Sequence, residues 1–302
     1  MERIILDVDT GEDDMVALLL AASSPFIAIE AVVATSGNQI IEHTLENTLN
    51  VCQLLGIDAP VYEGSHLPLL RKQITGGHIH GENGLSGPVF PPRIKQKEKE
   101  YGVKAIIDLI MGNPHEITVV ATGPLTDVAM ALRLEPRVAE YVKRIIFMGG
   151  ALKGGNITEY AEFNFFADPE AAQIVLSSEA KLVMFGLDVT LQVQLDQKRL
   201  DGYHTFEGKA AAMFTSGMDF YMESCKRVTN DYPAMHDPCC IAYLIEPSIF
   251  KGEDHTLDVE IKDEETYGMV KDRGRGGNVK VMLQADAQRF WSLLEQALEN
   301  LA

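Results

Sequence analysis

The sequence predicts an α/β fold: a single domain, residues 1–302, with a mainly parallel, helix-flanked sheet of the open, Rossmann-like kind and an active or binding site at the carboxyl ends of the strands. Three observations support this prediction. Short β-branched apolar runs alternate with stretches of helical periodicity, which is typical of a parallel sheet covered on both faces. The chain of 302 residues is long enough to bury a full core. It contains no internal repeat and no low-complexity linker that would divide it.

The first two thirds of the chain contain five strand-and-helix units. The expected strands are nearly continuous apolar runs, at Ile4–Asp7, Ile27–Thr35, Ile117–Thr122, Arg144–Met148 and Lys181–Leu187. The expected helices between and after them are Asp13–Ala22, Ile41–Leu55, Val103–Met111, Leu125–Leu132 and Pro169–Ser177. In such a sheet, ligands bind in the crevice outside the carboxyl ends of the strands, so the residues that follow each strand are the candidates for function.

Two regions depart from this alternation. The segment from about residue 64 to residue 99 is rich in glycine and proline and has little periodicity, and a loop this long is usually functional or disordered. We expect it to be a mobile lid loop. The C-terminal third predicts a small β excursion around a turn at Gly274–Gly277 and then a final helix, with these bounds: Leu257–Lys262, Thr266–Val270 and Val279–Leu283 for the strands, and Ala285–Leu301 for the helix.

The charge balance argues against some partners. The formal net charge is −18, from 44 acidic and 26 basic residues. A protein that binds nucleic acid normally presents a basic face, and anionic lipid attracts basic segments, so we expect neither a nucleic-acid nor a membrane partner. An acidic surplus is otherwise a common property of soluble proteins and does not identify a ligand.

Cysteine use and the N-terminal sequence indicate a compartment. None of the four cysteines (Cys52, Cys225, Cys239 and Cys240) belongs to a CxxC pair, so buried free thiols are a better interpretation than a zinc site or a disulfide framework. The N-terminus has no apolar stretch long enough for a signal peptide. Polar residues also interrupt the most apolar window, Met15–Ala34, which argues against a membrane span. These features predict a cytoplasmic protein.

The most unusual strand end is the first. Five acidic residues lie within eight positions: Asp7, Asp9, Glu12, Asp13 and Asp14. A helix start, with Thr10 as N-cap and Asp13 three residues later, would explain the acids of the first helical turn. It does not explain Asp7 and Asp9, which follow a strand. Closely packed carboxylates repel one another unless a cation lies among them, and oxygen ligands suit Ca²⁺ or Mg²⁺ better than zinc. We therefore favour a metal site.

Three downstream clusters add polar groups. Asn156, Glu162 and Asn164 precede the run Asp168-Pro169, which has the form of a helix cap followed by proline at the first helical position. We assign Asp168 to structure and expect Glu162 and Asn164 to be free to bind a polyol.

The other two clusters contain histidine. In His236-Asp237-Pro238, the aspartate is either a helix cap or a ligand beside a proton donor. In the glycine-rich run from Gly77 to Gly84, the pair His78 and His80 is either a surface feature or part of a lid that brings a histidine over a pocket.

Taken together, these motifs resemble those of the nucleoside hydrolases that prefer inosine and uridine. That family has an Asp-x-Asp-x-Gly-x-Asp-Asp turn after its first strand, which here runs from Asp7 to Asp14. Further motifs match in the family's order and span most of the chain: Gly37-Asn38, His80-Gly81-Glu82, Thr122-Gly123-Pro124-Leu125-Thr126, Met148-Gly149-Gly150, Glu162-Phe163-Asn164, Ala167-Asp168-Pro169-Glu170-Ala171 and His236-Asp237-Pro238. The acidic turn alone would be only suggestive, but the ordered set is highly specific.

The resemblance implies an enzyme that hydrolyses the N-glycosidic bond of ribonucleosides to ribose and free base. It implies one Ca²⁺ held by Asp9, Asp14, Asp237 and the backbone carbonyl of Thr122. Asp9 would also be the general base that takes a proton from a calcium-bound water. Asp7 would brace the turn behind these ligands.

The resemblance also implies a set of substrate contacts. The residues expected to bind the ribose hydroxyls are Asp13, Asn38, Asn156, Glu162 and Asn164, with Met148 against the sugar. His236 would protonate or polarise the leaving base, and His80 would close over it. Such a carboxylate-rich site suits the oxocarbenium-like cation that forms as the glycosidic bond breaks. It also predicts that 2′-deoxynucleosides are poor substrates.

The leaving-group side is less defined. His236 favours a pyrimidine-preferring or broad-specificity enzyme, because the purine-specific branch stacks the base between tryptophans and the single tryptophan here, Trp291, lies in the last helix. Either Tyr221 or Tyr232 could contact the base. The family is commonly dimeric or tetrameric, which implies a homodimer or homotetramer.

Two alternatives remain open at this stage. A haloacid-dehalogenase-type phosphatase also opens with an Asp-x-Asp turn, but it does not require the adjacent Asp13-Asp14 pair. A calcium-dependent ribonucleoside- or sugar-binding protein could keep the same pocket without turnover.

Overall fold

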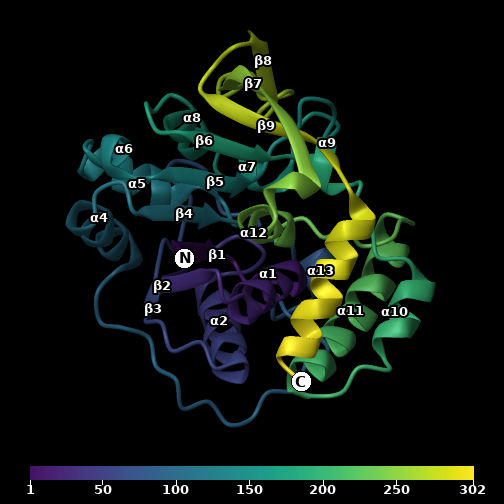
Figure 1. Ribbon diagram of the computed structural model, residues 1–302. Coiled ribbons are helices and arrows are strands. Elements are labelled where there is room, and N and C mark those ends of the chain that lie inside the picture. The colour runs from purple at the N-terminus through teal and green to yellow at the C-terminus, as the bar shows by residue number, and fades with distance from the viewer.

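Nine strands form one sheet in the computed structural model, which describes residues 1–302 (Figure 1). The strands are β1 Glu2–Val8, β2 Ile27–Ala34, β3 Val61–Glu63, β4 Ile117–Ala121, β5 Arg144–Met148, β6 Leu182–Phe185, β7 Phe250–Val259, β8 Val270–Arg275 and β9 Val279–Ala285. Their order is β3-β2-β1-β4-β5-β6-β9-β7-β8, and all neighbours are parallel except that β7 is antiparallel to β8 and β9. The first six strands follow the doubly wound order, which confirms the predicted fold class.

Thirteen α-helices and one short 3₁₀ helix, η1 Pro247–Ile249, accompany the sheet. The helices are α1 Glu12–Ser23, α2 Ile41–Leu55, α3 Gly77–His80, α4 Gly102–Gly112, α5 Thr126–Leu134, α6 Val138–Tyr141, α7 Phe163–Ala167, α8 Pro169–Leu176, α9 Leu187–Thr190, α10 Gln197–Tyr203, α11 Lys209–Val228, α12 Pro238–Ile245 and α13 Ala287–Asn300. No helix is long and apolar enough to cross a membrane.

The sheet separates two hydrophobic cores. Successive side chains of β1 point to opposite faces, so Ile4 and Leu6 belong to one core and Ile5 to the other. Helices α1, α2, α11, α12 and α13 cover the larger core, and α4, α5 and α8 cover the smaller one. Figure 1 shows α4–α6 on one side of the molecule and α10, α11 and α13 on the opposite side. Because both faces are covered, the central strands are apolar along nearly their whole length.

The carboxyl ends of the central strands lie at the topological switch point. β1 pairs with β2 on one side and with β4 on the other, and the chain leaves β2 and β4 toward opposite faces of the sheet. Doubly wound sheets bind ligands at this position because the diverging connections leave a crevice there. The acidic turn after β1 and Thr122 after β4 both lie at its edge.

The structure corrects the predicted C-terminal strands. β7 begins at Phe250, earlier than expected, because its exposed charged residues obscure the strand pattern. The predicted strand Thr266–Val270 is wrong, since residues 266–269 form a turn with Gly268 at φ +81°, a conformation that side chains disfavour. The C-terminal strands also belong to the main sheet and do not form a separate small β structure, because β9 pairs in parallel with β6.

Other elements match the predictions or were missing from them. The first five predicted strands and helices and the final helix are confirmed within a few residues. The three-residue strand β3 and the helices α10 and α11 were not predicted. The segment 64–99 contains one short helix, α3, and is otherwise irregular, as expected. Its mobility stays a prediction.

Candidate active site

The acidic turn links β1 to α1 and differs in one respect from the predicted helix start. The N-cap of α1 is Gly11, not Thr10, and the backbone N–H of Gly11 donates to Asp14 Oδ2 at 3.0 Å. The hydroxyl of Thr10 instead lies 2.7 Å from the hydroxyl of Thr48 in α2. Capping therefore accounts for one oxygen of Asp14 and leaves the other carboxylates of the turn for another role.

Three buried carboxylates converge on one point. Oxygens of Asp13, Asp14 and Asp237 lie within 4.8 Å of one another. Asp237 is the N-cap residue of α12 with Pro238 next, as the structural alternative predicted, but its side chain makes no capping hydrogen bond and remains available as a ligand. Asp13 Oδ1 is buried without any hydrogen-bond partner. Oxygen-only donors that include an unpartnered carboxylate oxygen fit a hard divalent cation.

Burial makes this group of acids costly to ionise together. It raises the pKa of Asp13 to about 7 and raises the pKa values of Asp9 and Asp237 well above their ordinary range, and neighbouring aspartates add to the effect in each case. The pKa of Asp14 is raised less, because the hydroxyl of Thr122 donates to its Oδ1 at 2.6 Å. A bound cation would remove this repulsion, which is a physical reason to expect a metal here.

Asp9 lies beside this cluster rather than within it. Its Oδ2 accepts the backbone N–H of Asn38 at 2.7 Å. A Cβ at Gly37 or at Gly123 would collide with the Asp9 carboxylate, so these glycines of the strand-end turns allow the backbone to approach it closely. The carboxylate is thereby held in place by the ends of three strands. Its roles as metal ligand and general base stay predictions, as does the bracing role of buried, unpartnered Asp7.

The side chains expected to be free for a sugar are partly engaged by the protein. Glu162 is the N-cap of α7, and its carboxylate accepts backbone N–H groups of Gly150, Asn164 and Phe165 at 2.8, 2.9 and 3.2 Å. Burial nevertheless raises the pKa of Glu162 to about 7. Glu162 is therefore engaged as a helix cap, and its side chain also lines the cavity described below, so its role as a ribose ligand stays a prediction.

Asn164 and Asn156 are also anchored. The amide of Asn164 donates to the carbonyls of Thr122 and Met148 at 2.7 and 3.1 Å, so each carbonyl keeps one lone pair. Asn156 Oδ1 accepts the backbone N–H of Phe163 at 2.9 Å. Asp168 caps α8 through the N–H of Ala171, which confirms its structural assignment.

The opposite wall consists of histidine and aromatic side chains. His80, in α3, stacks on Tyr221 of α11 with ring centroids 5.5 Å apart. His236 Nδ1 lies 2.8 Å from the hydroxyl of Thr190 in α9. Burial and the nearby His80 lower the pKa of His236 to about 4, so this imidazole is neutral at neutral pH. Tyr221 is buried, whereas Tyr232 is 43% exposed at the rim.

These walls enclose a cavity of about 420 Å³, within the range of small-molecule sites. Of the residues predicted to form the site, Asp14 alone does not line it, because it is fully buried. The lining set is Asp9, Asp13, Asn38, His80, Thr122, Met148, Asn156, Glu162, Asn164, His236 and Asp237. The fold thus brings together residues that are more than 220 positions apart in the sequence.

Comparison with known proteins identifies the family of this chain. Residues 4–292 match the family model of the inosine-uridine preferring nucleoside hydrolases. The chain belongs to this family. A pyrimidine-specific ribonucleoside hydrolase, RihB of Escherichia coli, is 40% identical over 307 aligned positions that cover 99% of this chain and 97% of the relative.

Solved structures of nucleoside hydrolases have the same fold. A purine-preferring ribonucleoside hydrolase from Gardnerella vaginalis superimposes with a TM-score of 0.94 at 28% identity, covering 99% of both chains. A plant nucleoside hydrolase superimposes with a TM-score of 0.90 at 28% identity, covering 98% of both chains. The protein is therefore a nucleoside hydrolase, an enzyme that cleaves N-glycosidic bonds, and the predicted activity is confirmed.

Two residues of this nucleoside hydrolase site were not singled out from the sequence. Thr190 contacts His236, and its signal was only its position after the fifth predicted strand. Glu12 was attributed to the helix dipole, yet its carboxylate contacts His80 at 2.6 Å. Both contacts join segments that are far apart in sequence, so no local pattern could have indicated them.

Proposed function

We propose that this enzyme is a calcium-dependent ribonucleoside hydrolase that prefers pyrimidine nucleosides or accepts a broad range of bases. The main support is the cluster of Asp13, Asp14 and Asp237 beside Asp9, buried at the floor of a cavity of about 420 Å³. The 40% identity to a pyrimidine-specific relative supports the base preference, as does a lining in which His236 and two tyrosines, but no tryptophan, face the cavity.

The proposed ion ligands are Asp9, Asp14, Asp237 and the backbone carbonyl of Thr122. Asp13 belongs to the same cluster, so its carboxylate would contact both the ion and the ribose hydroxyls. When bound, calcium would supply charge compensation for these acids, orient the ribose diol and make a water molecule more acidic. Calcium is favoured over magnesium because the site offers several protein oxygens, whereas magnesium usually keeps several of its own waters.

Asp9 is the proposed general base. The backbone N–H of Asn38 and the close approach of Gly37 and Gly123 fix its carboxylate at the cavity floor. From there it would accept a proton from the attacking water on the face of the sugar opposite the base. The surrounding carboxylates would stabilise the positive charge that develops on the ribosyl group as the bond breaks.

Ribose recognition would use the remaining polar side chains of the floor. Asn38, Asn156, Glu162 and Asn164 line the cavity. Bonds to backbone groups hold the side chains of Asn156, Glu162 and Asn164 in one orientation. The amide of Asn38 donates to Asp14 Oδ2 at 3.4 Å. Such preorganisation lowers the cost of binding a polyol. Met148 would pack against the sugar ring.

His236 is the proposed donor to the leaving base, assisted by Thr190. The hydroxyl of Thr190 has one hydrogen and lies closer to His236 Nδ1, at 2.8 Å, than to the Gly186 carbonyl, at 3.2 Å. If it donates to Nδ1, the hydrogen of the neutral imidazole resides on Nε2, the other ring nitrogen. A neutral Nε2–H can donate to a carbonyl oxygen or ring nitrogen of the departing base.

The proposal also covers the oligomeric state and the compartment of the enzyme. Family members are commonly dimers or tetramers, and the exposed apolar residues Leu67, Tyr101 and Leu134 border a groove that a second copy could cover. We accordingly propose a homo-oligomer. Four buried free thiols are compatible with a cytoplasmic enzyme.

A nucleoside panel tests the proposal. Purified protein is incubated with uridine, cytidine, inosine and adenosine, and free ribose is assayed with a chelator and after re-addition of Ca²⁺ or Mg²⁺. We expect ribose from uridine or cytidine at rates equal to or above those from the purine nucleosides, loss of activity with chelator and recovery with Ca²⁺. Recovery with Mg²⁺ alone would contradict calcium dependence. Binding of uridine without ribose release would favour the binding-protein alternative, and phosphate release from phosphomonoesters would favour the phosphatase.

A further inference from the structure

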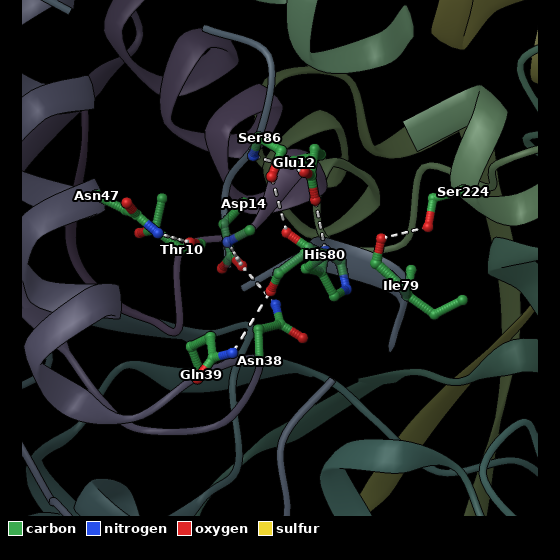
Figure 2. A network of polar contacts seen from close by, with 12 residues as sticks. Thr10, Glu12, Asp14, Asn38, Gln39, Asn47, Ile79, His80, Ser86 and Ser224 are labelled. Atoms are coloured by element: carbon green, nitrogen blue, oxygen red, sulfur yellow. Dashed lines mark hydrogen bonds and ion pairs between the residues drawn. The ribbon is translucent and has the colours of Figure 1, made fainter. Parts of the chain in front are cut away.

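Glu12 is a fully buried carboxylate that has no part in the mechanism above. It lies inside the acidic turn, between Gly11 and Asp13, at the first residue of α1. Its two oxygens have different partners: Oε2 lies 2.6 Å from His80 Nδ1, and Oε1 accepts the backbone N–H of Ser86 at 3.0 Å. Figure 2 shows both contacts from the single Glu12 side chain. Both partners belong to the predicted lid segment.

The contact with Glu12 fixes which nitrogen of His80 is available for a ligand. Because Nδ1 faces a carboxylate, it carries a hydrogen whether the imidazole is neutral or charged. Nε2 has no protein partner, and His80 lines the cavity. The absence of a side chain at Gly11 permits this approach, since a Cβ there would lie 2.8 Å from His80 Nδ1. The ring is further held by its stacking on Tyr221.

Residues 76–87 of the lid are also attached at other points, but by a different kind of contact. Ser224 donates to the carbonyl of Ile79 at 2.6 Å, and Asn47 donates to the carbonyl of Asn83 at 2.8 Å. The amide of Gln39 makes a longer contact of 3.4 Å with the carbonyl of Gly81. All three are bonds from neutral side chains to backbone oxygens, as Figure 2 illustrates for Ser224 and Ile79. For residues 76–87, Glu12 supplies the charged contacts, which are the stronger class of hydrogen bond. Other carboxylates hold the earlier part of the lid: Asp127 accepts from Ser65, Asp168 from Leu69 and Glu170 from Arg71.

The position of Glu12 connects two parts of the site. The next two residues along α1, Asp13 and Asp14, belong to the carboxylate cluster. A displacement of the first turn of α1 would therefore move the cluster and the lid contacts together. Between the two attachment points, Gly81 and Gly84 adopt positive φ angles of +79° and +77°, which turn the chain so that Ser86 returns to the same carboxylate that holds His80.

We propose that Glu12 is a positioning residue that latches the lid: it orients His80 with Nε2 toward the leaving base and holds the turn from His80 to Ser86 over the cavity. The expected effect on catalysis rests on the proposed function. The contacts of Glu12 with the lid do not depend on it. A carboxylate is required because two oxygens accept from two donors. In a glutamine, one of these positions would be an NH₂ group facing an N–H donor.

The experiment compares Glu12→Gln with the matched control Glu42→Gln, an exposed glutamate of α2. Hydrogen–deuterium exchange is followed in peptides that span residues 76–87, and the ¹⁵N shifts of the histidine rings are recorded in protein with labelled histidine. For Glu12→Gln we expect faster exchange in the lid peptides and an altered His80 ring signal, and for the control we expect wild-type behaviour. Unchanged lid exchange and an unchanged His80 signal in Glu12→Gln would overturn the latch, whether or not the protein hydrolyses nucleosides.

Kinetics test the link to His80. We expect Glu12→Gln and His80→Ala each to lower kcat/KM for uridine about tenfold, and the double variant to be no slower than the slower single variant, because Glu12 acts through His80. Calcium affinity of Glu12→Gln, measured by titration calorimetry, should match the wild type. If the two reductions in kcat/KM multiply in the double variant, or if Glu12→Gln loses calcium binding, Glu12 acts through the metal cluster instead. A wild-type protein without hydrolase activity would refute the proposed function while leaving the exchange result valid.

Discussion

The two walls of the cavity are built in different ways. The sheet wall consists of Asp9, Asp13, Thr122, Glu162, Asn164 and Asp237, which follow strands or begin helices at the switch point and are almost completely buried. The lid wall consists of His80, Tyr221, Tyr232 and His236, which come from α3, α11 and the chain before α12. The sheet wall contains the carboxylates, and the lid wall contains the groups suited to a base.

This difference suggests how one fold serves several substrates. The Gardnerella enzyme is named purine-preferring and the Escherichia coli relative pyrimidine-specific, yet the former has the same fold as this chain with a TM-score of 0.94 and the latter is 40% identical to it. Strand ends fixed by a parallel sheet hold the chemistry constant, whereas helices and loops can change without disturbing the sheet. We therefore expect changes in the sheet wall to affect all nucleosides equally and changes in the lid wall to affect bases unequally.

The largest expected effect comes from the sheet wall, through Asp9→Asn. The amide keeps the shape of the side chain but cannot accept the proton from water, so kcat should fall by about 10²–10⁴-fold. The loss should be similar for uridine and inosine. Stopped assays of ribose release, together with uridine-binding calorimetry, measure both properties. A variant that keeps a near-wild-type rate would show that Asp9 is not the general base.

The second prediction concerns the ribose hydroxyls. Removing the 2′-hydroxyl eliminates hydrogen bonds to charged or metal-bound groups of the sheet wall, so kcat/KM for 2′-deoxyuridine should be about 10–100-fold below that for uridine. The same ratio should hold for inosine and 2′-deoxyinosine, because the lid wall does not contact the sugar in this scheme. Equal turnover of uridine and 2′-deoxyuridine would show that the sheet wall does not recognise the 2′-hydroxyl.

A smaller effect is expected from the lid wall, through Thr190→Val. Valine has the shape of threonine but leaves His236 Nδ1 without its partner, and the loss of a neutral hydrogen bond should lower kcat for uridine about 2–10-fold. For 4-nitrophenyl riboside, whose leaving group needs no proton, the rate should not change. Thr215→Val, at a buried hydroxyl that bonds within α11, provides the control. An equal loss on both substrates would assign Thr190 to packing alone.

The smallest expected effect is on stability. The pKa values of Asp13 and Glu162 are raised to about 7, so protonation stabilises the fold at low pH, and this stabilisation is lost as the pH rises through 7. The melting temperature of the metal-free protein should therefore fall between about pH 5 and about pH 8. Added calcium should raise it by about 5 °C more at the higher pH, because ionised carboxylates bind the ion. Scanning calorimetry at both pH values checks the sign, and an equal gain at both would contradict it.

The sheet wall was also the more predictable of the two from sequence. Ile4–Asp7 and Ile117–Thr122 are apolar enough to identify buried parallel strands. A helix start does not explain Asp7 and Asp9 at the end of the first of these strands, which indicated a functional site there. Parallel strands expose their carboxyl ends at one edge, so residues that follow different strands could be placed together without coordinates.

The lid wall could not be placed in the same way. The contacts of Glu12 with Ser86 and of Thr190 with His236 depend on how helices pack on the sheet, which leaves no periodic trace. β7 was assigned too short for a different reason, since charged residues occupy its exposed positions and interrupt the apolar pattern. The capping role of Glu162 was not predicted, because a helix cap and a ligand use the same carboxylate oxygens.

The carboxylate cluster also has a consequence for how the protein is made. Asp13 and Asp14 are synthesised near the start of the chain, and Asp237 more than 220 residues later, so the three oxygens within 4.8 Å cannot meet until most of the polypeptide has left the ribosome. Contacts of such large sequence separation form late, after the loops that separate them have closed. A nascent or truncated chain therefore lacks the complete cluster, and affinity for a divalent ion would report that folding of this hydrolase has finished.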